Sequence, residues 1–143
     1  MKLISHRGNL EGKNLARENS PSFIKEALSK GYHVEVDVWI VENKYYLGHD
    51  TPQYSIKPSF LRNKRLWCHA KNHVAFEKML KDGKIHCFWH EDDNYTLTSR
   101  GIPWVYPNTQ LLKGSVCVLP EKGYIGCIHD CKAICSDYIN RYR

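Results

Sequence analysis

The chain has 143 residues, 42% of them hydrophobic and 25% charged, which is the balance of an ordinary globular protein. This length predicts a single domain over residues 1–143 and is well below the roughly 250 residues of a complete (β/α)₈ barrel. No segment is long and charge-free enough to span a bilayer, and the polar start of the chain predicts no secretory signal, so we expect a cytoplasmic protein. The formal charge of +6 favours an anionic partner: a phosphodiester, a nucleic acid or a membrane surface.

The first part of the chain predicts a strand, a loop and a helix. Residues 2–5 form a short apolar run, and a polar loop follows. Ser20 then caps a helix with Pro21 at its first position, and apolar side chains recur at helical spacing until Gly31.

The middle of the chain alternates strands with a helix. Over residues 33–40, valines alternate with polar residues, which is the period of a strand, and a hairpin arm follows at 44–47. Further strands are predicted at 65–70 and 85–90, on either side of a helix at 72–80. Such alternation predicts a parallel sheet, and small closed versions of that sheet are barrels.

The second half is expected to be simpler. After Asp93 the helical patterns stop, and only brief apolar runs remain between glycines and prolines. These runs are residues 102–106, 115–119 and 133–139.

The six cysteines allow two interpretations. In a small secreted protein they would form disulfides, but nothing indicates export, so we expect reduced and mostly buried thiols. The other interpretation is a structural zinc site formed by Cys127, His129, Cys131 and Cys135. Their spacing lacks the CxxC pairs that are typical of zinc sites.

Two carboxylates on the strand at 33–40 are candidate metal ligands. Glu35 and Asp37 are two residues apart, so both side chains leave one face while the valines leave the other. Neighbouring carboxylates repel unless a proton or a cation offsets them, and oxygen ligands favour Mg²⁺ or Ca²⁺. The alternative is a solvent-facing strand with scattered charge.

Four short motifs follow one another over residues 2–50. They are His6-Arg7, Glu18-Asn19, Glu35-x-Asp37 and His49-Asp50. In this order and at these separations they resemble the motifs of the glycerophosphodiester phosphodiesterase family. The resemblance implies metal-dependent cleavage of a phosphodiester, with His6 and His49 as general acid and base and with Glu35 and Asp37 as ligands of a divalent cation.

The same resemblance implies a TIM barrel. Because the chain is short, we expect an α/β fold of reduced TIM-like (β/α) barrel type, with helices shortened or missing in the second half. The expected partner is a small-molecule or lipid-derived phosphodiester, with no specific nucleic acid and no transmembrane segment.

The family has Glu-x-Lys on its third strand, where this chain has His69-Ala70-Lys71. By resemblance, His69 completes the metal site and Lys71 faces the phosphate. A histidine in place of a carboxylate lowers the ligand charge by one and favours softer metals. The alternative for His69 is a core histidine.

Four further residues are candidates by resemblance. Arg7 and Asn19 would contact the phosphate, and Trp104 the substrate, with Glu18 in a supporting role. Glu18 and Asn19 also have the composition of a helix-entry loop, and a tryptophan near a proline is more often a packing residue.

The expected chemistry requires these residues to meet. Each lies at the carboxyl end of a predicted strand or in the loop after it, and such ends converge at one edge of a parallel sheet. No role is assigned to the remaining histidines, and the acidic run at 91–93 is expected to be a solvated turn. The alternative function is a non-catalytic phosphate- or nucleic-acid-binding module on the same fold, and a steep salt dependence of oligonucleotide binding would favour it.

Overall fold

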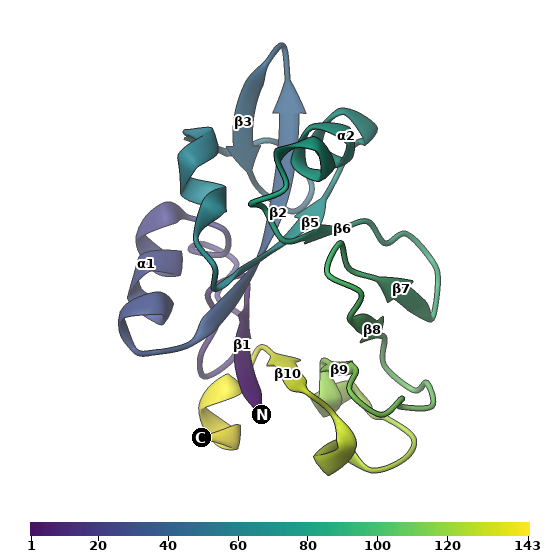
Figure 1. Ribbon diagram of the computed structural model, residues 1–143. Helices are drawn as coiled ribbons and strands as arrows, with labels where there is room; N and C mark the ends of the chain where they lie inside the picture. Colours follow the sequence, from purple (N-terminus) through teal and green to yellow (C-terminus); the bar gives the residue numbers. More distant parts are fainter.

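The computed structural model describes residues 1–143, which form a mixed α/β fold on one ten-stranded sheet (Figure 1). The strands are β1 (Lys2–His6), β2 (His33–Val41), β3 (Lys44–Leu47), β4 (Tyr54–Ile56), β5 (Leu66–Ala70), β6 (Cys87–Phe88), β7 (Tyr95–Leu97), β8 (Pro103–Val105), β9 (Val116–Val118) and β10 (Ala133–Ser136). The helices are α1 (Pro21–Ser29), α2 (His73–Asp82) and the 3₁₀ helices η1 (Pro58–Arg62), η2 (Pro120–Lys122), η3 (Ile128–Asp130) and η4 (Ile139–Tyr142). The predicted α/β class is confirmed.

A parallel series of strands forms the centre of the sheet. Its order is β6-β5-β2-β1-β10-β9-β8, so the first and last parts of the chain meet where β1 pairs with β10. Antiparallel strands β3 and β4 continue from β2, and β7 pairs with β8. The apolar runs predicted in the second half coincide with β8, β9 and β10.

The sheet does not close into a barrel, which corrects the expectation of a TIM-like barrel. No strand pairing joins β6 to β8. The one strand between them in the chain, β7, pairs with β8 and not with β6, so the sheet stays open at this position. Hydrogen bonds tie the two edges locally: the Ser99 amide donates to the Cys87 carbonyl at 2.7 Å, and the Cys87 amide donates to Ser99 Oγ at 3.0 Å.

No α-helix follows α2, and only the short 3₁₀ helices η2, η3 and η4 lie after Asp93, so the expected shortening or loss of helices in that part of the chain is confirmed. Ser20 caps α1 by accepting a hydrogen bond from the Phe23 amide, and Asn72 caps α2 by accepting one from the Ala75 amide. Gly83 ends α2 with a φ of 67°, in the left-handed region that glycine tolerates. Neither helix is long and apolar enough to cross a membrane.

The side chains of β2 divide between two environments. Val34, Val36 and Val38 are fully buried in the larger core, which includes residues of α1 and α2. Glu35 and Asp37 leave the opposite face, as their spacing predicts.

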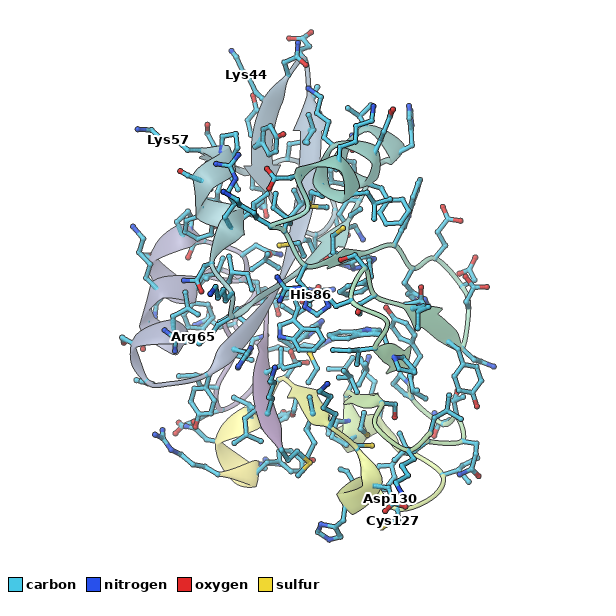
Figure 2. The ribbon with its side chains drawn as sticks, viewed as in Figure 1. Lys44, Lys57, Arg65, His86, Cys127 and Asp130 are labelled. Atoms are coloured by element: carbon cyan, nitrogen blue, oxygen red, sulfur yellow. The ribbon has the colours of Figure 1, made fainter.

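A smaller core lies on the face of the sheet that Glu35 and Asp37 occupy. The Trp104 ring lies 4.5 Å from Phe88 and 5.8 Å from Trp67, so aromatic side chains of β8, β5 and β6 meet across the open edge. His86 lies among these rings at the centre of Figure 2, with its Nε2 2.8 Å from Thr98 Oγ1, and burial lowers its pKa to about 4. His86 is therefore a neutral core residue.

The cysteines are all free, and all but Cys127 are buried. The cysteine-rich segment does not form a metal-binding group: His/Cys/Asp/Glu side chains gather closely enough to hold an ion only at Glu35, Asp37 and His69.

Candidate functional site

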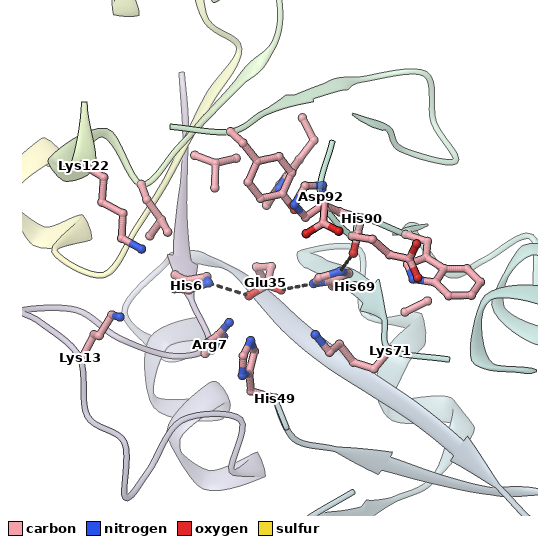
Figure 3. Close-up of a pocket in the computed structure, with 17 residues that line it drawn as sticks. His6, Arg7, Lys13, Glu35, His49, His69, Lys71, His90, Asp92 and Lys122 are labelled. Carbon is pink, nitrogen blue, oxygen red and sulfur yellow. Dashed lines mark hydrogen bonds and ion pairs between the residues drawn. The ribbon is translucent and has the colours of Figure 1, made fainter. Parts of the chain in front are cut away.

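A pocket of about 560 Å³ lies at the carboxyl-terminal ends of the parallel strands (Figure 3). It collects residues from the ends of β1, β5 and β8, from β2, and from the loops that follow β3 and β6. Most of the predicted site residues line it: His6, Arg7, Glu35, His49, His69, Lys71 and Trp104. The convergence expected from a parallel sheet is present although the sheet is open.

Glu35, Asp37 and His69 form a compact cluster at this pocket. The parallel register pairs His6 with Glu35 and Asp37 with His69, which brings side chains of three strands together. His69 Nδ1 lies 3.1 Å from Asp37 Oδ1 and 3.7 Å from Glu35 Oε1. One ligand atom from each of the three residues lies within 4.8 Å of the others.

Each of the two carboxylates has one buried oxygen that accepts no well-aligned hydrogen bond, although His69 Nδ1 lies 3.1 Å from that of Asp37. These oxygens are Glu35 Oε2 and Asp37 Oδ1. A buried, unpaired carboxylate oxygen is costly unless a proton or a cation compensates it. Two carboxylates with an imidazole nitrogen are a donor set for a divalent metal, so the residues present fit such an ion.

The charges of the two carboxyl groups respond differently to this environment. Burial and the neighbouring Asp37 raise the pKa of Glu35 well above its ordinary value. Burial also opposes ionisation of Asp37, but the close approach of His69 and the charge of Arg7 outweigh it and lower the pKa of Asp37. Without a metal ion, the pair therefore favours one negative charge, located on Asp37.

His69 is oriented as a metal ligand would be. Its Nε2 lies 3.1 Å from the carbonyl oxygen of His90, which can only accept, so Nε2 carries a hydrogen. The ring stacks on Phe88 with centroids 5.0 Å apart and an angle of 8°. Nδ1 therefore faces Glu35 and Asp37, where either a proton or a metal ion must lie between the nitrogen and the carboxylate oxygens.

Asn19 and Arg7 contact Asp37 directly, and Glu18 in turn contacts Arg7. Asn19 donates from Nδ2 to Asp37 Oδ2 and accepts from the Asp37 amide, both at 2.9 Å. Arg7 Nε lies 3.0 Å from the same Oδ2, an ion pair without the alignment of a hydrogen bond, and Arg7 Nη1 donates to Glu18. Asn19 is fully buried and is not among the residues that line the pocket, so its side chain positions the Asp37 carboxylate and does not reach the pocket surface.

The backbone at this point is strained. Arg7 and Asn19 have φ values of 57° and 63°, in the left-handed region, which costs roughly 1 kcal/mol or more for a residue such as arginine. The Asn19 amide donates to the Arg7 carbonyl and the Arg7 amide to the Glu35 carbonyl, each at 3.0 Å. These bonds hold the two motifs against β2.

His6 is oriented by Asp137, a residue outside the four sequence motifs. His6 Nδ1 lies 2.7 Å from Asp137 Oδ1, which also accepts from Asn9 Nδ2 at 2.9 Å. Burial opposes ionisation of Asp137, but the bonds from His6 and Asn9 prevail and lower its pKa. With Nδ1–H donated to this carboxylate, Nε2 faces the pocket, 3.7 Å from Glu35 Oε2.

Replacing Asp137 by asparagine tests this role. The new side chain could present its amide group to His6 and favour the wrong tautomer, so we expect kcat for the reaction proposed below to fall by roughly 10–100-fold, with KM and metal affinity nearly unchanged. The matched control is Asp130→Asn, at an exposed aspartate on the lower side of Figure 2 that is not among the pocket-lining residues. Equal effects of the two substitutions would contradict a positioning role for Asp137.

His49 and Lys71 reach the pocket from loops. His49 follows β3, its side chain is 43% exposed, and its Nδ1 lies 2.7 Å from Asp50 Oδ1. Partial burial and then the charge of Arg7 lower the pKa of His49, which favours its neutral form. Lys71 follows β5, is half-buried and has no carboxylate partner, so its ammonium group is available to an anion.

Trp104 is only 2% exposed and packs against Phe88 beneath the pocket. Trp104 therefore supports the pocket wall from below and offers little surface to a ligand.

The structure adds lining residues that the motifs did not indicate. They are Lys13, Trp89, His90, Glu91, Asp92, Tyr106 and Lys122, with a few apolar side chains. His90 stacks on Tyr106 with centroids 3.3 Å apart, and burial lowers its pKa to about 4. The acidic run after β6, expected to be a solvated turn, is exposed but lies at the pocket rim through Glu91 and Asp92.

No family model, curated protein or solved structure matches the chain. The chemistry of the pocket is therefore inferred from its own residues.

Proposed function

We propose that the protein is a metal-dependent phosphodiesterase of glycerophosphodiester phosphodiesterase type, which cleaves a small-molecule or lipid-derived phosphodiester. The observation that carries the proposal is the convergence in one pocket of two histidines, two cationic side chains, Glu35 and His69, with the fully buried Asp37 completing the cluster beneath them. The open parallel sheet would then be a reduced version of the family's barrel. The parallel pairing of the first strand, β1, with the last, β10, supports that relation, because a closed barrel joins its first and last strands in this way.

Each side chain has a physical task in this reaction. Glu35, Asp37 and His69 would hold the divalent cation, Mg²⁺ or Ca²⁺ or a softer metal that accepts a nitrogen ligand. When bound, the cation supplies positive charge that neutralises a phosphate oxygen as charge develops. Arg7 and Lys71 donate hydrogen bonds to the remaining phosphate oxygens.

The two histidines would move the protons. His49 is favoured as the base, because its lowered pKa keeps it neutral and able to take the proton of the attacking hydroxyl, from the substrate or from water. His6 is favoured as the acid: when its ring carries both protons, Nδ1–H is donated to the Asp137 carboxylate and Nε2–H faces the pocket, where it can protonate the leaving alkoxide and leave His6 neutral. The attacking oxygen bonds to phosphorus while the bond to the leaving oxygen breaks.

A non-catalytic phosphate- or nucleic-acid-binding module is the second candidate, favoured by His69 in place of a carboxylate and by the charge of +6. Binding alone does not require His6 to be held by Asp137, which Asn9 in turn supports.

The test is release of product from glycerophosphodiesters and from bis(4-nitrophenyl) phosphate, with Mg²⁺, Ca²⁺ or Mn²⁺ and with EDTA. We expect turnover with at least one metal and none in EDTA. Absence of turnover with every metal, from folded protein, would support the binding module, as would salt-sensitive binding of oligonucleotides.

A further inference from the structure

Two lysines outside the motifs line the pocket on one side. Lys13 lies in the loop after β1, and Lys122 ends η2. Figure 3 shows both on the same side of His6, away from His69 and Lys71. Neither forms an ion pair with any residue of the chain.

The loops that carry the two lysines are fixed to one point. The Gly12 amide donates to the Asp137 carbonyl at 2.8 Å, next to Lys13. Glu121, next to Lys122, accepts from the Asp137 amide at 3.0 Å and from Ser136 Oγ at 2.9 Å. Both loops are therefore anchored at the residue that orients His6.

The turn that leads to Lys122 has an unusual backbone. Leu119, itself a lining residue, has a φ of 47° and a ψ of 56° and precedes Pro120. A left-handed conformation is costly for leucine, and the residue before a proline normally prefers an extended conformation. This strained turn lies at the pocket and directs the chain into η2, so that Lys122 lies at the pocket rim.

Charge is unevenly distributed around the pocket. Lys13 and Lys122 lie on the His6 side, whereas Asp92, in the loop after β6, lies on the side of His69 (Figure 3). An anionic group would be attracted to the first side and repelled from the second. The phosphodiester itself already has the metal cluster, Arg7 and Lys71 as partners, so the two lysines are free for a different anion.

We propose that Lys13 and Lys122 form a second anion-binding subsite and that the substrate carries a further anionic group, a phosphate or a carboxylate, on the arm next to His6. This inference rests on the proposed phosphodiesterase function and names its substrate class. The subsite orients the diester, because an arm anchored there places the scissile phosphate between His6 and the metal cluster.

Three glycerophosphodiesters test the subsite. They share the glycerol arm and differ only in the end of the short alkyl arm that leaves, which is a hydroxyl, a carboxylate or a phosphate, and release of this alcohol is measured. In wild type we expect kcat/KM for the anionic arms to exceed that for the hydroxyl arm by about tenfold, since two exposed charge pairs together contribute about that factor. The ranking of the two anionic arms tells a phosphate subsite from a carboxylate subsite.

The variant is K13Q/K122Q, and the control is K44Q/K57Q, at two exposed lysines on the upper part of Figure 2 that do not line this pocket. Both double variants remove the same net charge, so a loss that is common to both reports the overall charge of the protein and not the subsite. We expect the preference for anionic arms to disappear in K13Q/K122Q and to persist in K44Q/K57Q. Turnover without such a preference, or equal losses in both variants, would overturn the subsite and leave the phosphodiesterase proposal standing.

Binding supplies a readout that does not need turnover. Calorimetry in the presence of Mg²⁺ compares inorganic phosphate with ethylene glycol bisphosphate. We expect the bisphosphate to bind about tenfold more tightly, and this advantage to be lost only in K13Q/K122Q. If no diester is cleaved but the advantage is present, the catalytic proposal fails and the subsite stands; if the bisphosphate has no advantage, the subsite is wrong.

Discussion

Alanine at His6 or at His49 is expected to lower kcat for phosphodiester cleavage by about 10²–10⁴-fold, the usual contribution of a general acid or base. Both side chains line the pocket, and His6 is held by Asp137 with Nε2 toward Glu35. The metal cluster contains neither histidine, so metal affinity should change little in both variants.

The choice of leaving group separates the two roles. 4-Nitrophenolate leaves without protonation, whereas a glycerol alkoxide needs a proton, so the general acid matters only for the second. We expect His6→Ala to lose much less activity on bis(4-nitrophenyl) phosphate than on a glycerophosphodiester, and His49→Ala to lose the same factor on both. His73→Ala and His129→Ala, at exposed histidines outside the pocket, are the controls. Unchanged turnover of the glycerophosphodiester in either His6→Ala or His49→Ala would contradict the two-histidine mechanism.

Glutamine at Glu35 and asparagine at Asp37 should each weaken binding of the divalent cation by at least about 100-fold, because each removes a charged ligand and not merely its support. Calorimetric titration with Mg²⁺, Ca²⁺ and Mn²⁺ measures this without any substrate. Glu42→Gln, at an exposed glutamate in the turn after β2, is the control. Unchanged metal affinity in the two pocket variants would show that the cluster is not the metal site.

The same two variants should change the stability of the metal-free protein in opposite directions. The folded-state pKa of Glu35 is raised, so ionising Glu35 destabilises the fold as pH rises above its ordinary value, and Glu35→Gln removes that cost. The folded-state pKa of Asp37 is lowered, so its charge stabilises the fold above its ordinary value and that contribution is lost as pH falls. Asp37→Asn loses it at any pH, together with the ion pair to Arg7.

Thermal unfolding in EDTA at about pH 8 measures both effects. We expect Glu35→Gln to raise Tm and Asp37→Asn to lower it, each by about 2–8 °C for about 1 kcal/mol in a chain of this size. The increase for Glu35→Gln should shrink at about pH 5, where Glu35 is already protonated in the folded state. Shifts of the same sign in both variants would contradict the assignment of the single negative charge to Asp37.

The parts of the site that follow from local sequence pattern could be predicted. Alternation along β2 placed Glu35 and Asp37 on one face, and the parallel register that the pattern implies brought His6 and His69 beside them. The helix start at Ser20-Pro21 could likewise be predicted, because capping depends on neighbouring residues alone.

The parts of the site that depend on contacts between residues far apart in the sequence could not be predicted. Asp137 reaches His6 because β10 pairs with β1, with Ser136 opposite Ser5, and no local pattern indicates that partnership. The orientation of His69 depends on a backbone carbonyl, that of His90, which any residue type would supply. The sheet is open because β7, in the stretch after β6, pairs with β8 and not with β6. The composition of this stretch does not indicate which of the two strands it pairs with.

The most direct test compares occupancy of the cluster with activity in one titration. Metal-free protein is titrated with Mg²⁺, Ca²⁺ or Mn²⁺ while binding is followed by calorimetry and turnover by release of 4-nitrophenolate. We predict that turnover rises from zero along the binding curve, with the same half-saturating metal concentration, and that Glu35→Gln shifts both curves together. Turnover that persists in EDTA, or a metal that saturates the cluster while no phosphodiester is cleaved, would contradict a metal-dependent phosphodiesterase at this site.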